Sequence, residues 1–264
     1  MKRLIENVRA FLRLILFFLL SLATAISVAA GNILFGFIKP AMVTKWKNRI
    51  ITIWAWLTAK ILRLRISSEG APPAPPFFLV SNHLSYIDVI PLWYFLDGTF
   101  IAKSEVASWP FFGWGTRTLG VLFIDRKLQG DVQRMNNRVA ETISESQGII
   151  LFPEGTSSKG ERVLPFNSSL LNYPAEKKMP VSCAVVSYRS SDANRPAWSH
   201  LCWWGDMAFF PHFWELLKIK QVDVMIRFGE KHTAGDRKEL AKQLHTEVSQ
   251  LFVPIVDSRN ECKE

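Results

Sequence analysis

The chain has 264 residues, 48% of them hydrophobic, and carries 32 Lys and Arg against 23 Asp and Glu. Its first 65 residues hold 11 of the basic residues and one of the acidic ones, so the excess positive charge lies in the first quarter of the chain. A nucleic-acid-binding domain needs basic residues on its folded body, whereas here they flank an apolar segment, so we expect no nucleic-acid partner. Three cysteines without Cys-x-x-Cys spacing predict a reducing compartment and no metal site.

An uncharged run covers residues 14–38. As a continuous helix it would exceed the roughly 30 Å hydrocarbon thickness of a bilayer. Basic residues favour the cytoplasmic side of a membrane, and they flank this run at both ends, so both ends favour the same side. These flanking residues are Lys2, Arg3, Arg9 and Arg13 before the run and Lys39, Lys45, Lys47 and Arg49 after it.

A second apolar stretch, residues 50–64, is short for a membrane span and contains Trp54 and Trp56, which suit the headgroup region. We therefore expect residues 1–69 to form two membrane-anchoring helices that enter one leaflet from the cytoplasmic face. The turn between them is expected near Gly31 or at residues 36–40. A single full crossing and a cleaved signal peptide are the alternatives.

The proline-rich residues 70–76 are expected to form a domain boundary, because consecutive prolines continue neither a helix nor a central strand. After it, short apolar runs alternate with helical patterns. This alternation predicts an α/β catalytic domain over residues 77–264, with a mixed, mostly parallel sheet flanked by helices. The expected strands are residues 77–80, 99–102, 121–124, 148–152, 181–188 and 222–228. The expected helical faces are Val132, Met135, Val139 and Ile143, and Leu240, Leu244, Val248 and Leu251.

Residues 82–88, Asn-His-Leu-Ser-Tyr-Ile-Asp, follow the first of these strands, where open α/β sheets bind ligands. With His83 in the loop and Asp88 in the first turn of a helix, the carboxylate can hydrogen-bond one imidazole nitrogen. The other nitrogen is then free to accept a proton as a general base. Alternatively, Ser85 and Asp88 form a capping box, and the only role of Asp88 is to cap the start of the helix.

Two further blocks also follow strands. Residues 120–126 end in Arg126, whose planar guanidinium suits a phosphate, although a surface salt bridge with Asp125 is the simpler interpretation. Residues 152–158 contain Gly155, which allows close approach of the backbone to a ligand. The stretch from Trp203 to Trp214 is interpreted as aromatic core packing or membrane-facing packing.

In order and spacing, the three blocks resemble those of the membrane-bound glycerolipid and lysophospholipid acyltransferases, typified by 1-acylglycerol-3-phosphate acyltransferase. The resemblance covers about residues 75–190. It implies that His83 is the general base and Asp88 its orienting partner. It also implies that the substrate is bound by Arg126, Glu154, Gly155, Thr156 and, between the first two blocks, Lys103.

The resemblance implies transfer of a fatty acyl group from acyl-CoA or acyl carrier protein to the free hydroxyl of a lysophospholipid. The expected acceptor is 1-acyl-sn-glycerol-3-phosphate, giving phosphatidic acid, with no cofactor and no metal. The third block departs from the family because Ser157 stands where an arginine usually follows the threonine. This departure leaves two other acceptors open, a lyso-ornithine lipid and a lysophospholipid with a larger headgroup. A non-catalytic lipid-binding relative and a hydrolase with the same His-Asp pair are the remaining alternatives.

Overall fold

The computed structural model describes residues 1–36, 40–109, 112–125 and 130–256. In this part of the chain a seven-stranded sheet has the order β1-β7-β6-β2-β5-β3-β4. Neighbouring strands are parallel except β6 and β7, so β1 and β7 run opposite to the other five strands. The strands are β1 (Leu64–Glu69), β2 (Phe78–Ser81), β3 (Gly98–Lys103), β4 (Leu122–Ile124), β5 (Gly148–Leu151), β6 (Val181–Ser190) and β7 (Val222–Phe228).

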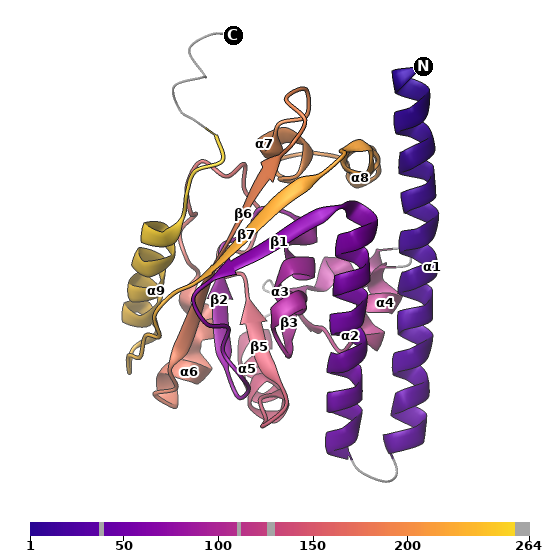
Figure 1. The fold of residues 1–264 in the computed structure, drawn as a ribbon. Helices are drawn as coiled ribbons and strands as arrows, with labels where there is room; N and C mark the ends of the chain where they lie inside the picture. The colour runs from indigo at the N-terminus through magenta and orange to yellow at the C-terminus, as the bar shows by residue number, and fades with distance from the viewer. Residues whose placement is uncertain (37–39, 110–111, 126–129, 257–264) are drawn as a thin grey trace.

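Helices cover both faces of the sheet (Figure 1). The predicted fold class, a mixed and mostly parallel sheet flanked by helices after a long apolar segment, is therefore confirmed. Short 3-10 turns lie at Tyr86–Asp88 (η1), Ser104–Ser108 (η2) and Ser168–Leu171 (η3). The helices are α1 (Lys2–Gly36), α2 (Pro40–Leu62), α3 (Val89–Phe95), α4 (Phe112–Thr118), α5 (Asp131–Thr142), α6 (Asn172–Glu176), α7 (Ala197–His200), α8 (Phe209–Lys218) and α9 (Arg237–Leu251).

The two faces of the sheet bury two separate hydrophobic cores, because alternate side chains of a strand point in opposite directions. On β2, Leu79 packs with residues of α2, α3 and α8, whereas Phe78 and Val80 pack with residues of α5, α6 and α9. The two predicted helical faces are found on α5 and α9, except that Ile143 lies one residue beyond the end of α5. The side chain of Asp236 caps α9 by accepting hydrogen bonds from the backbone N–H groups of Lys238 and Glu239.

The sheet begins earlier than expected. Residues 64–69, which the sequence analysis counted with the membrane-anchoring helices, form β1 and pair in parallel with β7. This strand precedes the proline-rich residues 70–76. It was missed because it is an edge strand with mostly exposed, polar side chains, so it lacks the apolar run by which the other strands were predicted.

The helices α1 and α2 form an antiparallel hairpin beside the sheet (Figure 1). Helix α1 ends at Gly36 and α2 begins at Pro40, which agrees with the second predicted turn position. Trp54 of α2 donates a hydrogen bond from Nε1 to Ser21 Oγ of α1 at 3.1 Å. Near the turn, a Cβ at Gly31 would lie 2.1 Å from the Trp46 ring, so only glycine permits this packing.

Buried polar contacts hold the amino-terminal part of α1 against the body. Glu6 and Arg195 form an ion pair at 2.8 Å. The buried guanidinium of Arg13 donates hydrogen bonds to the carbonyl oxygens of Leu217 and Ile219, at the carboxyl end of α8. A cation stabilises that end of a helix because several carbonyls there lack partners within the helix.

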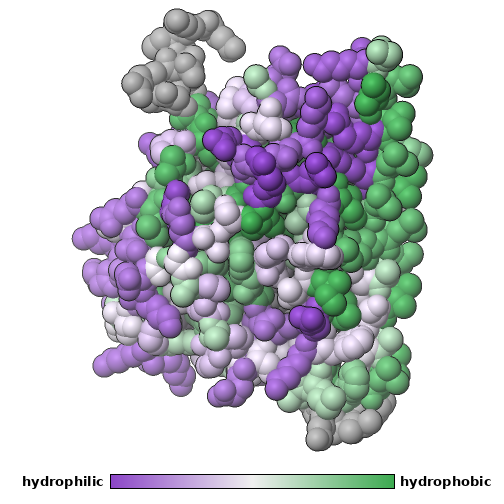
Figure 2. Space-filling view, in the orientation of Figure 1, coloured by the Kyte–Doolittle hydropathy of each residue, from purple (hydrophilic) through white to green (hydrophobic). Residues whose placement is uncertain are grey.

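The opposite face of α1 is exposed and apolar over nearly its whole length. Figure 2 shows this face as a continuous hydrophobic edge of the molecule. Within the described residues, α1 is the one helix long and apolar enough to cross a membrane. The exposed side chains recur at helical spacing and are Leu4, Ile5, Val8, Phe11, Leu12, Ile15, Leu16, Leu19, Leu22, Ile26, Ile33 and Leu34.

Candidate active site

The site begins where β2 ends, at the buried side chain of Asn82. Its Nδ2 donates to the carbonyl oxygen of Val186 at 3.0 Å, and its Oδ1 accepts from the Val186 N–H at 2.8 Å. The amide thus continues the pairing of β2 with β6 by one further position after Ser81. This contact sets where the chain leaves the sheet, so the next residue, His83, lies at the carboxyl end of β2.

His83 and Asp88 are joined by a hydrogen bond of 2.8 Å between Nδ1 and Oδ2. Asp88 is fully buried in the first turn after the loop, whereas the His83 side chain is 21% exposed. A carboxylate oxygen can only accept, so the bonded Nδ1 carries a hydrogen and Nε2 of the neutral ring is left as an acceptor. This arrangement can take a proton from a hydroxyl group placed beside the ring.

Asp88 also holds the start of η1, the short helical turn in which it is the last residue. Its Oδ2 accepts from the backbone N–H groups of Leu84 at 2.7 Å and Ser85 at 3.0 Å. The structural and functional interpretations of this residue are therefore compatible, because one carboxylate oxygen holds both the loop backbone and the His83 ring.

The loop after β5 supports His83 from a second direction. The Phe152 ring stacks on the imidazole with a centroid distance of 4.1 Å and an interplanar angle of 11°. The His83 N–H donates to Glu154 Oε1 at 2.8 Å, and the His83 carbonyl accepts from the Ser158 N–H at 3.0 Å. His83 is thus held through its ring face, its Nδ1 and both its backbone N–H and carbonyl groups.

Glu154 joins two loops. In addition to the His83 N–H, it accepts from the Leu164 N–H through Oε2 at 2.9 Å. Burial raises the pKa of this carboxyl to about 8, against the opposing effect of the two N–H donors. Its side chain does not line the pocket described below, whereas the next two residues, Gly155 and Thr156, do. Gly155 has a positive φ of 72°, which glycine adopts without strain.

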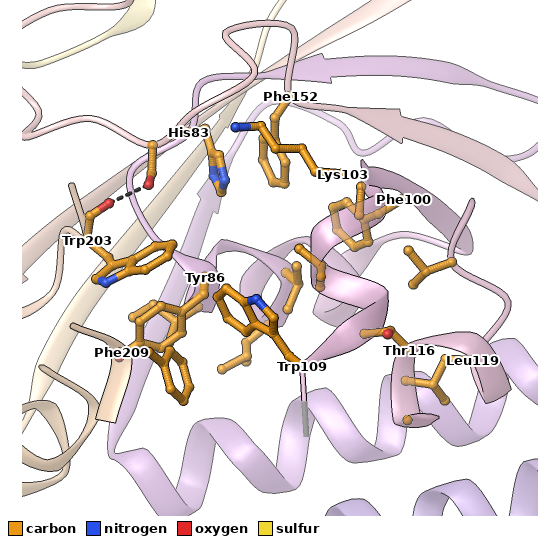
Figure 3. Close-up of a pocket in the computed structure, with 18 of the residues that line it drawn as sticks. His83, Tyr86, Phe100, Lys103, Trp109, Thr116, Leu119, Phe152, Trp203 and Phe209 are labelled. Atoms are coloured by element: carbon orange, nitrogen blue, oxygen red, sulfur yellow. Dashed lines mark hydrogen bonds between the residues drawn. The ribbon is translucent and has the colours of Figure 1, made fainter. Parts of the chain in front are cut away.

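A pocket of about 570 Å³ lies beside His83 and extends to α1 and α2. Figure 3 shows aromatic side chains around it, and the Lys103 side chain extends toward His83 and Phe152. Among the described residues of the lining, one side chain carries an amine and one a carboxylate: Lys103, the last residue of β3, and Glu105 of η2. The remaining wall is mostly apolar and includes Phe17, Phe18, Ala25, Trp54, Tyr86, Ile90, Trp93, Phe100, Val106, Trp109, Leu119, Phe152, Trp203, Phe209 and Phe213.

Of the residues selected from the sequence, six meet at this place. His83, Lys103, Gly155 and Thr156 line the pocket, and Asp88 and Glu154 hydrogen-bond His83 from behind. Arg126 lies outside the described residues. The part of the chain that the structure describes contains no group of three His, Cys, Asp or Glu side chains that could hold a metal ion.

Ser157, which stands where an arginine is usual in the third block, contacts the segment that contains Trp203. The Ser157 hydroxyl donates to the carbonyl oxygen of Trp203, drawn as a dashed line in Figure 3, and the Trp203 N–H donates to the Leu84 carbonyl at 2.8 Å. The Trp203 segment therefore connects the first and third blocks and forms pocket wall. Lys159, two residues further along the same loop, forms an ion pair with Glu161 at 2.8 Å.

Two contributors were missed by the sequence analysis. Tyr188 of β6 donates from its hydroxyl to Asp88 Oδ1 at 2.6 Å, and burial raises the pKa of this tyrosine well above its usual range. Tyr86 lies inside the first block, lines the pocket and hydrogen-bonds His212 Nδ1 at 2.9 Å. Tyr188 is 100 residues from Asp88 and appeared only as the end of a predicted strand, so sequence pattern carried no signal for it.

The chain is also similar to known proteins. The acyltransferase family model matches residues 63–187. The chain is 32% identical to the lyso-ornithine lipid O-acyltransferase of Pseudomonas aeruginosa, over 77% of this chain and 78% of the relative. It is 26% identical to the 1-acyl-sn-glycerol-3-phosphate acyltransferase of Neisseria gonorrhoeae, over 69% and 72% of the two chains.

A solved structure has the same fold. The crystal structure of the 1-acyl-sn-glycerophosphate acyltransferase PlsC from Thermotoga maritima superposes with a TM-score of 0.63, covering 95% of this chain and 98% of that one at 20% identity. The matched family model and the relative from Pseudomonas aeruginosa, together with the His83-Asp88 pair beside an apolar pocket, identify this chain as a member of the acyltransferase family.

Proposed function

We propose that the protein transfers a fatty acyl group from an acyl thioester, acyl-CoA or acyl carrier protein, to the free hydroxyl of a lysolipid, with His83 as the general base. The observation that carries this proposal is the Nδ1 contact with buried Asp88, which leaves Nε2 as an acceptor at the pocket. The mostly apolar pocket favours a substrate with a long hydrocarbon chain.

In the proposed reaction, His83 Nε2 takes the hydroxyl proton as the acceptor oxygen attacks the thioester carbonyl. The resulting tetrahedral oxyanion collapses, the carbon–sulfur bond breaks, and the imidazolium returns the proton to the leaving sulfur. Asp88 stabilises the imidazolium between these steps. Thr156 and Ser157 line the pocket, and their backbone N–H groups donate to no acceptor in the described part of the chain, so these two groups are candidates to bind the oxyanion.

The His83→Ala variant should lose roughly 100-fold to 10,000-fold of the rate, the usual contribution of a general base. The assay follows thiol release and labelled diacyl lipid together, with purified protein, acyl-CoA and a lysolipid. His200→Ala, outside the pocket, serves as the matched control and should keep its rate. Equal thiol release by wild type and His83→Ala would contradict the mechanism, and free fatty acid in place of diacyl lipid would indicate a hydrolase.

For the acceptor, we favour a lyso-ornithine lipid over 1-acyl-sn-glycerol-3-phosphate. Ornithine offers a carboxylate and an ammonium group, and Lys103 and Glu105 offer the complementary pair at one side of the pocket. A phosphate monoester would instead favour a wall rich in cations. Ser157 replaces the usual arginine of the third block, and the relative from Pseudomonas aeruginosa is more similar to this chain than that from Neisseria gonorrhoeae. The glycerophosphate acceptor is retained as the second candidate because all three blocks resemble those of such enzymes.

The Glu105→Gln variant should lower kcat/KM for a lyso-ornithine lipid by about two-fold to five-fold, the range expected for one partly solvated charge contact. Its kcat/KM for 1-acyl-sn-glycerol-3-phosphate should stay level or rise, because a negative charge near the phosphate is removed. Glu141→Gln, an exposed change on α5, is the control. A wild-type preference for the glycerophosphate acceptor would refute the assignment of the headgroup.

We further propose that α1 lies in one leaflet and that the α/β body is on the cytoplasmic face. Two observations support this. Glu6 and Arg13 hold one end of α1 on the body, and Trp54 and Trp46 contact α1 along the remainder. The apolar face from Leu4 to Leu34 therefore runs along the body, over about 45 Å at 1.5 Å per residue. A bilayer on that face gives lipid substrates access to the pocket, which α1 also lines.

Cysteine labelling tests this arrangement. In right-side-out vesicles, Ile33→Cys should react with a membrane-impermeant maleimide only after solubilisation. Glu145→Cys, exposed on the body, should react in inverted vesicles. Labelling of Ile33→Cys from outside the intact vesicles would show that α1 crosses the membrane.

A further inference from the structure

Tyr188 lies on the part of β6 that extends past the end of β2. The pairing of β2 with β6 ends at Ser81 and Ala184, and β6 continues to Ser190. Alternate residues of a strand share a face, so Tyr188 points to the same side of the sheet as Ala184 and Val186, toward the core under the first block. It is 5% exposed and does not line the pocket.

The Tyr188 hydroxyl binds the oxygen of Asp88 that His83 does not use. Oδ2 accepts from His83 Nδ1 and from the N–H groups of Leu84 and Ser85. Oδ1 accepts from Tyr188 at 2.6 Å, its one hydrogen-bond partner within the described residues. The carboxylate therefore accepts from donors of two parts of the chain. Its charge also raises the pKa of two other titratable groups, the Glu154 carboxyl and the Cys202 thiol, and neither of them hydrogen-bonds it in the described part of the chain.

We propose that Tyr188 is a positioning residue for acyl transfer, acting through Asp88 on the orientation and basicity of His83. The inference rests on the proposed function, because it assigns to Tyr188 a part in the use of His83 as a base.

The physical effect follows from the sharing of charge. A donor on Oδ1 withdraws negative charge from the carboxylate, so less of that charge acts on the imidazole. Removing the donor strengthens the attraction between Asp88 and a protonated His83 ring, and the ring then holds its proton to higher pH. Removal also leaves a buried carboxylate oxygen without a partner, which loosens the geometry of the pair.

The Tyr188→Phe variant keeps the ring and removes the hydroxyl. We expect kcat to fall about ten-fold, the loss typical of one hydrogen bond to a charged group. KM should stay within about two-fold, because substrate binding depends on contacts in the pocket and Tyr188 makes none there. The acidic limb of the kcat/KM profile should move to higher pH by about half a unit, as removal of a donor to the partner carboxylate predicts.

Thr99→Val is the matched control. It also removes a buried hydroxyl, which donates to the Gly120 carbonyl at 2.9 Å, but Thr99 contacts neither Asp88 nor the pocket. It should lower the melting temperature without moving the pH profile. If Tyr188→Phe folds poorly, 3-fluorotyrosine at position 188 preserves the shape and strengthens the donor, and it should move the acidic limb to lower pH.

The outcomes separate the two proposals. Activity that survives in His83→Ala refutes the proposed base and with it this inference. An inactive His83→Ala together with a wild-type kcat and pH profile in Tyr188→Phe refutes the inference alone. A loss in Tyr188→Phe that only matches its folded fraction, with an unmoved acidic limb, also refutes it.

Discussion

The arrangement of the candidate active site depends on one buried carboxylate. Asp88 accepts hydrogen bonds from a side chain of its own loop, from two backbone N–H groups of that loop and from Tyr188 on a neighbouring strand. A buried carboxylate without such partners would be strongly destabilising, so the loop, the strand and the imidazole are held together by the requirement to satisfy it. The same contacts determine which nitrogen of His83 faces the pocket.

The rest of the fold brings that nitrogen to an apolar space connected with α1. His83 lies at the carboxyl end of β2, while the far side of the pocket is formed by residues of α1 and α2. Helix α1 contributes its buried face to the body and leaves its other face exposed and apolar. Glu6, Arg13 and the two tryptophan contacts with α1 keep this helix beside the body, so the helix with the exposed apolar face is also a wall of the pocket.

The central part of the fold could be predicted from local sequence because its strands are buried on both faces and read as apolar runs. The contact between His83 and Asp88 could be predicted because the two residues are only five positions apart, one in the loop and one in the first turn that follows it. The edge strand β1 could not, since its side chains are mostly polar and its place is decided by pairing with β7. The contributions of Tyr188, Asn82 and Trp203 depend on contacts between segments distant in sequence, which no local pattern encodes.

The most direct test of this account is the position of the proton on the His83 ring. Nitrogen NMR of the enzyme labelled with 15N-histidine, recorded at a pH where the ring is neutral, distinguishes a protonated from an unprotonated ring nitrogen, and His83→Asn assigns the resonance. The account predicts a proton on Nδ1 and a bare Nε2, with the preference weakened in Asp88→Asn. A proton found on Nε2 in the wild-type enzyme would contradict the role of His83 as the base.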